Sequence, residues 1–269
     1  GGGGGALSTV LSFGGSGGSG VVIIRYTPTQ DLAVDIAGSA TGRLVGDSGA
    51  IPAGQFTLEG WAYLRSAVGQ VLVSQGTSVN SKVYVATLGG TGATAGDLYV
   101  AWGGLANSLW TEGSLSVKPP VDRWFHFALT RDSSGAPKFF LDGTEIAIGN
   151  STRLSTANPG GNLTVGGQFD GTGVANGLVD QIKVWGTALN ATGVQNSMHS
   201  YGATRSNGVV VQSGASLLAH YDFNEFVAGA PELSRTGTGP SLTRGSALTS
   251  ASYTDSQIIQ TGTAHTAQT

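Results

Sequence analysis

Short runs of alternating apolar and polar residues recur along most of the chain, separated by turns rich in glycine, serine and threonine. A period of two residues is typical of a β-strand that packs one face on a core. In residues 56–64, Phe56 and Leu58 share one face while Trp61 lies on the other. Apolar groups on both faces predict a central strand. The same reasoning predicts strands near residues 21–26, 32–36, 71–74, 82–88, 97–102, 124–131, 138–146, 177–185 and 217–223.

Two local signals complete this pattern. Asp142-Gly143 separates two short runs within residues 138–146, and Asp-Gly adopts the positive φ values that a tight hairpin turn needs. No stretch keeps a sustained helical period. Residues 190–198 predict one short helix, with Asn190 as its N-cap.

Composition narrows the class of protein. Glycine accounts for 45 of 269 residues and charged residues for 11%, which favours β-structure with many turns. Lysine and arginine total 13 against 16 acidic residues without a basic cluster, so nucleic acid is excluded as the main partner. The longest aliphatic run, residues 21–24, is too short to span a bilayer, and we expect no membrane insertion. The absence of cysteine removes disulfides and thiolate metal sites.

Three segments in order carry a family resemblance: Trp124 to Arg131, Lys138 to Ile146, and Gly177 to Trp185. They resemble the laminin-G-like, concanavalin A-like jelly-roll family, whose members often carry a "W-x-H-x-A" strand, an "x-V-D-G" hairpin and a "G-x-I-D-E-V-R-I-W" strand. The resemblance implies an all-β jelly-roll sandwich of two antiparallel sheets with a lectin-like character.

We expect three parts along the chain. Residues 1–20 form a glycine-rich arm or linker, residues 21–223 a laminin-G-like sandwich, and residues 224–269 an extension that completes the sandwich or begins another repeat. The arm cannot bury a core alone, so we expect it to order only against other chains. We expect residues 21–26 to pair with another strand.

The junction between the arm and residues 21–26 resembles a boundary in phage tail-fibre and other virion adhesin proteins. That resemblance implies assembly, through the arm, with copies of itself or with other virion or surface proteins.

Paired carboxylates of the kind that glycosidases need are missing. Glycosidases that resemble this fold carry an E-x-D-x-x-E strand, because one carboxylate must attack or stabilise while another donates a proton. None of the five glutamates has such a partner, no G-x-S-x-G elbow occurs, and the four histidines lack metal-ligand spacing. We therefore expect no enzyme activity. For His126, at the family's strand histidine, we expect a structural hydrogen-bonding role.

Asp180 is the most interesting carboxylate, because alternation places it on the same face as Ile182 and Val184. An inward carboxylate must be hydrogen-bonded, paired or bound to a cation. The resemblance allows Ca²⁺, with Asp170 and Asn176 close by in the chain, but no dense loop of oxygen ligands is visible. We expect a satisfied structural aspartate and no cofactor, with Ca²⁺ as the alternative.

Trp110 is the best candidate for stacking on a sugar ring. It lies near a glycine-flanked loop in which Asn107 could orient a ligand, and such platforms need an exposed ring beside polar groups. The alternative for Trp110 is packing in the core, which we expect for the other four tryptophans.

Together these features suggest a non-enzymatic virion or surface protein. It would be a homo-oligomeric phage tail-fibre or appendage adhesin that displays a carbohydrate-binding jelly roll for attachment to a host cell-surface glycan. The alternative is a self-assembling subunit of an extracellular filament or surface layer. Either hypothesis places the chain in a virion or at a cell surface. Fold alone does not decide between them.

Overall fold

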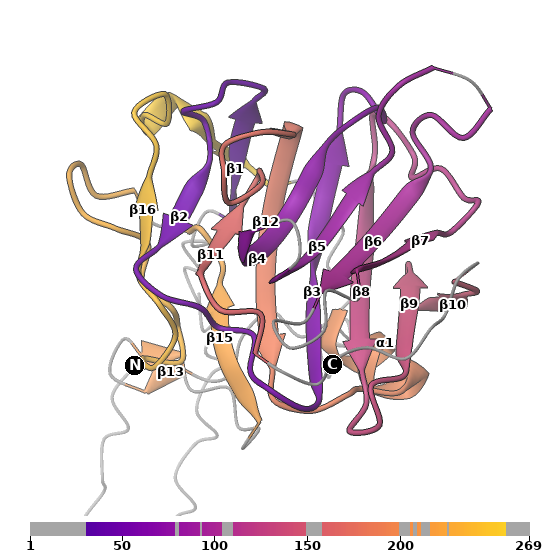
Figure 1. Ribbon diagram of the computed structural model, residues 1–269. Coiled ribbons are helices and arrows are strands. Elements are labelled where there is room, and N and C mark those ends of the chain that lie inside the picture. The colour runs from indigo at the N-terminus through magenta and orange to yellow at the C-terminus, as the bar shows by residue number, and fades with distance from the viewer. Residues whose placement is uncertain are drawn as a thin grey trace, which may run out of the picture.

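The computed structural model of the 269-residue chain describes residues 31–78, 81–91, 93–103, 110–148, 158–198, 205–206, 209–210, 216–224 and 226–256. These residues form two large antiparallel sheets stacked face to face, a separate two-stranded sheet, one short α-helix and one 3₁₀-helix (Ser250–Ser252) (Figure 1). The predicted jelly-roll sandwich is thereby confirmed. The arm at residues 1–20 and the strand predicted at residues 21–26 lie outside the described residues.

The first sheet has eight strands, and β3 lies near its middle between β8 and β12, as its two apolar faces predict. The path is β10-β9-β8-β3-β12-β1-β17, and β15 also pairs with β12. The strands are β1 (Leu32–Ala37), β3 (Phe56–Leu64), β8 (Trp124–Arg131), β9 (Pro137–Leu141), β10 (Thr144–Ile146), β12 (Asn176–Trp185), β15 (Leu217–Tyr221) and β17 (Tyr253–Asp255).

The second sheet has seven strands in the order β16-β2-β11-β4-β5-β6-β7, and β16 forms one edge. Its strands are β2 (Leu44–Gly46), β4 (Val71–Ser78), β5 (Ser81–Thr87), β6 (Leu98–Gly103), β7 (Trp110–Ser114), β11 (Asn162–Val165) and β16 (Leu242–Arg244). Two further short strands, β13 (Arg205–Ser206) and β14 (Val209–Val210), pair only with each other.

The main hydrophobic core fills the space between the two sheets. Leu58 and Phe127 contribute to it from the eight-stranded sheet, and Val85 and Leu163 from the seven-stranded sheet, all almost fully buried. Alternation along each strand therefore sends one set of side chains into this core and the next set to the outer faces.

Both local signals in the sequence are confirmed. Asp142 and Gly143 have φ values of 49° and 74° and join β9 to β10 in a two-residue hairpin. Helix α1 (Ala191–Met198) begins after Asn190, whose Oδ1 accepts a hydrogen bond from the Gly193 amide at 2.8 Å. This N-cap satisfies one of the amides that a helix start leaves without a partner. In the described part of the chain, no helix has the length and apolar character to cross a bilayer.

The C-terminal segment contributes to both sheets. β16 pairs with β2 through contacts such as Thr243 opposite Val45, and β17 pairs with β1. Segments about two hundred residues apart in the sequence therefore lie side by side at one end of the sandwich (Figure 1).

Candidate functional site

The predicted sugar platform lies at the opposite edge of the seven-stranded sheet from β16. Trp110 is the first residue of β7 and pairs with Gly103 of β6. Asn107, its predicted polar companion, lies outside the described residues. β7 forms the edge of this sheet, and the glycan role of Trp110 and Asn107 stays a prediction.

The predicted inward orientation of Asp180 is wrong, because β12 contains a β-bulge. The register against β3 shifts between Asp180 and Lys183, and Gln181 has a φ of 50°. An extra residue in one strand reverses the alternation beyond it. Asp180 pairs with Trp61, whose side chain packs outside the main core against Met198, whereas Ile182 is in that core.

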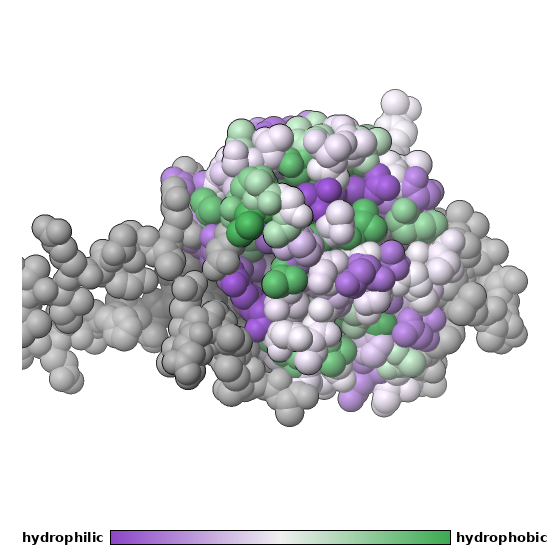
Figure 2. Space-filling view, turned by 90° about the vertical axis from the view of Figure 1, so that its left-hand side faces the viewer, coloured by the Kyte–Doolittle hydropathy of each residue, from purple (hydrophilic) through white to green (hydrophobic). Residues whose placement is uncertain are grey.

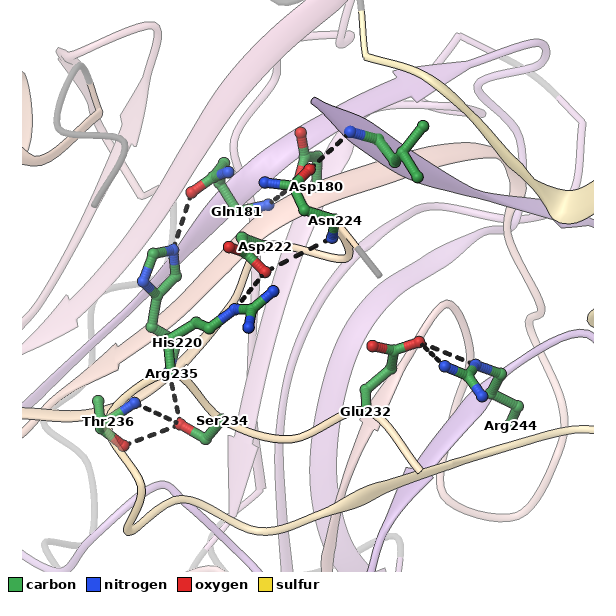
Figure 3. Close-up of polar contacts among 11 residues, drawn as sticks. Asp180, Gln181, His220, Asp222, Asn224, Glu232, Ser234, Arg235, Thr236 and Arg244 are labelled. Atoms are coloured by element: carbon green, nitrogen blue, oxygen red, sulfur yellow. Dashed lines mark hydrogen bonds and ion pairs between the residues drawn. The ribbon is translucent and has the colours of Figure 1, made fainter. Parts of the chain in front are cut away.

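The bulge anchors a network of polar groups, which we call the bulge cluster (Figure 3). His220 Nε2 lies 2.8 Å from Gln181 Oε1, and Asp222 Oδ1 accepts a hydrogen bond from Arg235 Nε at 2.7 Å. Asn224 Oδ1 accepts a hydrogen bond from the Leu32 amide at 2.6 Å. β1 and β15 both pair with the same edge of β12, and the bulge cluster connects the three strands there.

Asp180 lies fully buried in this cluster. Its Oδ1 accepts a hydrogen bond from the Gln181 amide at 2.6 Å, and the Ser256 hydroxyl also interacts with its carboxyl group. Burial, together with the nearby carboxylates of Asp31 and Asp222, raises the pKa of Asp180 well above its usual value. Burial and the positive charge of Lys183 lower the pKa of His220 to about 3. Both groups are therefore favoured in their neutral forms.

Asn176, one of the ligands suggested for Ca²⁺, does not lie beside Asp180. Asn176 opens β12 four residues earlier, roughly 13 Å away along an extended strand. Asp170 Oδ1 accepts hydrogen bonds from the amide and hydroxyl of Thr172. Within the described ranges, no group of three or more acidic or histidine side chains is arranged to hold a metal ion.

A second polar network lies on the outer face of the eight-stranded sheet beneath α1, and we call it the helix-covered cluster. Glu59 Oε1 accepts hydrogen bonds from Trp185 Nε1, at 2.7 Å, and from the Ser197 hydroxyl. Glu59 Oε2 lies 3.4 Å from His126 Nε2 without the alignment of a hydrogen bond. Lys183 Nζ donates to the Ser197 carbonyl at 2.7 Å.

In the helix-covered cluster, neighbouring side chains compensate the buried charge of Glu59. Burial alone would raise the pKa of Glu59, but His126, Lys183 and Ser197 together lower it to about 2. Burial lowers the pKa of Lys183, although Glu59 opposes that shift. The Glu59 and His126 side chains are each only 1% exposed, so substrate cannot reach them without displacing α1.

Two neighbouring hollows on the described surface lie beside β16. One hollow of about 280 Å³ is bordered by Phe226 and Pro231, close to the lower end of the volumes typical of small-ligand sites. A neighbouring hollow of about 190 Å³, which we call the β16 pocket, is lined by Thr41, Arg43, Val45, Thr243, Arg244 and Ser246. The two share four consecutive residues, 243–246. Figure 2 views this side of the molecule, where hydrophobic and hydrophilic residues intermingle.

The two arginines of the β16 pocket differ in how they are bonded. Arg244 donates to Glu232 Oε1 from Nε at 2.8 Å (Figure 3). Its guanidinium lies over the Phe226 ring, 4.6 Å from the ring centroid. Arg43 makes one hydrogen bond, from Nη1 to the Ala40 carbonyl. Its Nε is buried without a partner, and no carboxylate of the described residues pairs with it. Arg43 is therefore the uncompensated charge of the pocket.

The sequence pattern predicts neither the helix-covered cluster nor the β16 pocket. The sequence predicts a structural hydrogen-bonding role for His126. Its side chain is buried 3.4 Å from Glu59 Oε2, which agrees with a structural role, but this contact lacks the alignment of a hydrogen bond. Glu59 and Lys183 lie opposite each other on β3 and β12, so only the strand register brings them together. One signal in the sequence could have indicated that Glu59 is buried. It is a charged residue in a strand that has apolar groups on both faces.

Comparisons with known proteins agree with this architecture. A family model described as the concanavalin A-like lectin/glucanases superfamily matches residues 14–195. Among solved structures, the chain is similar to a Bacteroides ovatus protein named for a proposed carbohydrate-binding function. The TM-score is 0.55 at 18% identity, and the match covers 80% of this chain and 58% of that protein.

A second similar structure is the native heptameric SAP-like pentraxin from Limulus polyphemus. The TM-score is 0.50 at 12% identity, with 73% of this chain and 94% of the pentraxin covered. At such identities the likeness concerns the fold. A comparison with curated protein sequences finds no match.

Proposed function

The chain belongs to the concanavalin A-like lectin/glucanases superfamily, and we propose that it is a carbohydrate-binding domain without catalytic activity. The observation that carries this proposal is the contrast between the enclosed carboxylates and the accessible hollows. Glu59 and Asp180 are fully buried, whereas the residues that border the hollows at β16 include arginine, hydroxyl and glycine groups but no carboxylate. Glycoside hydrolysis needs two carboxylates that face a bound sugar.

The β16 pocket has chemistry suited to a sugar. Thr41, Thr243 and Ser246 are exposed and carry hydroxyl groups, and Val45 supplies an apolar surface. Sugar sites combine a few polar groups that fix orientation with apolar surface for a ring face. The loop that contains Asn107 and precedes Trp110 is a second candidate surface, supported by the stacking chemistry of the tryptophan.

A virion or cell-surface setting is the finer part of the proposal. It is supported by the resemblance of the glycine-rich N-terminal arm to boundaries in virion adhesins. In that setting the arm would join copies of the chain, and the jelly roll would attach to a host glycan. Electron microscopy of native particles or filaments, with this chain labelled, tests the setting. Label confined to the body of a filament made of this chain alone would favour the self-assembling alternative.

A glycan array probed with the purified chain tests the proposed function. We expect reproducible binding to a subset of glycans, and no release of reducing ends above the buffer control when those glycans are incubated in solution. Failure to bind any glycan contradicts the binding function. Release of reducing ends contradicts the absence of catalysis.

Trp110→Ala tests the platform predicted from the sequence. A stacked aromatic contributes on the order of 1 kcal/mol beyond its area burial, so binding should weaken roughly five- to tenfold while folding stays nearly intact. Binding and thermal melting are measured on the same preparation. Unchanged binding shows that Trp110 is not the platform, and an unfolded variant shows that it belongs to the core.

A further inference from the structure

We propose that the β16 pocket binds the anionic group of an acidic glycan, either a carboxylate or a sulfate ester, with Arg43 as the residue that selects for it. This inference rests on the proposed glycan-binding function and specifies its ligand class. The side chains that line the β16 pocket carry an excess of positive charge. Two arginines line the pocket and no acidic residue does.

Arg244 contributes little to this imbalance. Glu232 accepts hydrogen bonds from its guanidinium, the two form an ion pair, and the Tyr253 hydroxyl also lies within hydrogen-bond distance. A further donor of Arg244 reaches the Val227 carbonyl at 2.9 Å. Arg244 therefore holds the neighbouring 226–232 segment in place and has its charge compensated on the protein side.

Within the described part of the chain, Arg43 has no such compensation: its one hydrogen bond goes to a neutral carbonyl, and its Nε lacks an acceptor. A guanidinium is always charged at neutral pH, and its planar arrangement of donors matches a carboxylate or sulfate better than a neutral hydroxyl. An anionic group in the pocket would supply the charge that the protein does not.

The backbone around Arg43 is built to hold the side chain there. A Cβ atom added at Gly171, where φ is 89°, would lie 2.8 Å from Arg43 Nη1, and one added at Gly167 would lie 3.2 Å from its Cδ. Both glycines thus leave room for the arginine against the loop between β11 and β12. On the β16 side, the exposed hydroxyls of Thr243 and Ser246 can bond to the sugar that carries the anion.

The test compares matched glycans that differ only in charge. Array spots carry the same oligosaccharide ending in glucose, in glucuronic acid or in glucose 6-sulfate, and sialylated glycans extend the carboxylate arm. Isothermal titration then measures affinity for the soluble forms at low and high salt. We expect the acidic forms to bind more tightly than the neutral form, with an advantage that shrinks as salt screens the charge. Preference between the uronate and sulfate arms identifies the source of the anion.

Arg43→Gln removes the charge, and Arg43→Lys keeps it while losing the planar donors. Arg123→Gln is the matched control, because Arg123 is an exposed arginine that lines neither hollow. We expect Arg43→Gln to weaken acidic-glycan binding roughly tenfold or more, Arg43→Lys to weaken it less, and Arg123→Gln to change it less than twofold. Neutral-glycan binding should stay within about twofold for all three. Ser246→Ala, at an exposed position, should weaken acidic-glycan binding even if an Arg43 variant does not fold.

Each outcome separates this inference from the function on which it rests. The acidic-glycan inference alone is overturned if neutral and acidic forms bind with equal affinity, or if the Arg43 and Arg123 variants lose equal affinity for the acidic form. If no Arg43 variant folds, unchanged binding by Ser246→Ala overturns it. Inorganic sulfate that competes as strongly as the sulfated glycan would also overturn it, since the pocket would then recognise a simple anion. Binding to no glycan contradicts the proposed function and the inference together.

Discussion

The helix-covered cluster and the β16 pocket both bring charged side chains together, but they treat charge in opposite ways. Under α1, Glu59 is buried and meets His126, Trp185 and Ser197. At β16, Arg43 is partly exposed, makes one hydrogen bond and has no carboxylate partner among the described residues. Charges removed from water must be compensated within the protein, whereas a charge at a pocket can remain available to a ligand.

This difference separates the residues that mark the family from those that are candidates for binding. Two of the three segments that carry the resemblance, residues 124–131 with His126 and residues 177–185, lie in central strands of the eight-stranded sheet. The β16 pocket is built from the edge strand β16, its neighbour β2 and loop residues, and binding groups are commonly found on loops. Conspicuous sequence motifs in this chain therefore report on the fold more than on the ligand.

The largest effect on stability should come from Glu59→Ala. Glu59 opposes the cost of burying the Lys183 charge, and removing one partner of a buried charge network typically costs about 3–5 kcal/mol. Chemical denaturation of the variant should show this loss in the free energy of unfolding. Glu145→Ala is the control, because Glu145 pairs with Lys138 on the surface, where such pairs contribute about 0–1 kcal/mol. Similar losses for both variants would show that the helix-covered cluster is not a structural network.

Asp180→Asn should have a smaller effect that depends on pH. The pKa of Asp180 is raised in the folded chain, so its contribution to stability is fully present below the unfolded value near 3.8 and is lost as pH rises through the folded value. Asparagine carries no charge that must be buried beside Asp31 and Asp222. The stability of the variant relative to the natural chain should therefore increase with pH over this window.

Thermal and chemical denaturation across this pH range measure the effect of Asp180→Asn. Asp255→Asn is the control, since Asp255 is an exposed carboxylate at the end of β17. A difference that stays flat with pH for Asp180→Asn, or that falls, would show that the buried carboxyl is not held in its neutral form.

Much of the fold could be predicted from local pattern. The alternation in residues 56–64 predicts a central strand, the Asp142-Gly143 pair predicts the hairpin, and Asn190 predicts the start of α1, and all three are confirmed. Each of these signals lies within a few residues of the structure that it specifies.

The orientation of Asp180, the helix-covered cluster and the β16 pocket could not be predicted in this way. One extra residue at Gln181 reverses the alternation in β12, and the sequence holds no glycine there to mark the bulge. The β16 pocket depends on β2 pairing with β16, which joins Arg43 to Thr243 across about two hundred residues. Such sites follow from strand register, which cannot be predicted from the local pattern of apolar and polar residues.

Mapping a bound glycan by backbone amide chemical shifts tests most directly whether the accessible pocket, rather than the motif-bearing strands, binds ligand. The ¹⁵N-labelled chain is titrated with the tightest-binding acidic glycan from the array. We expect the shift changes to gather at residues 40–45 and 243–246, while the amides of β3 and β8 stay unchanged. Changes centred on the β6–β7 hairpin or on β3 and β8, with none around β16, would contradict this assignment.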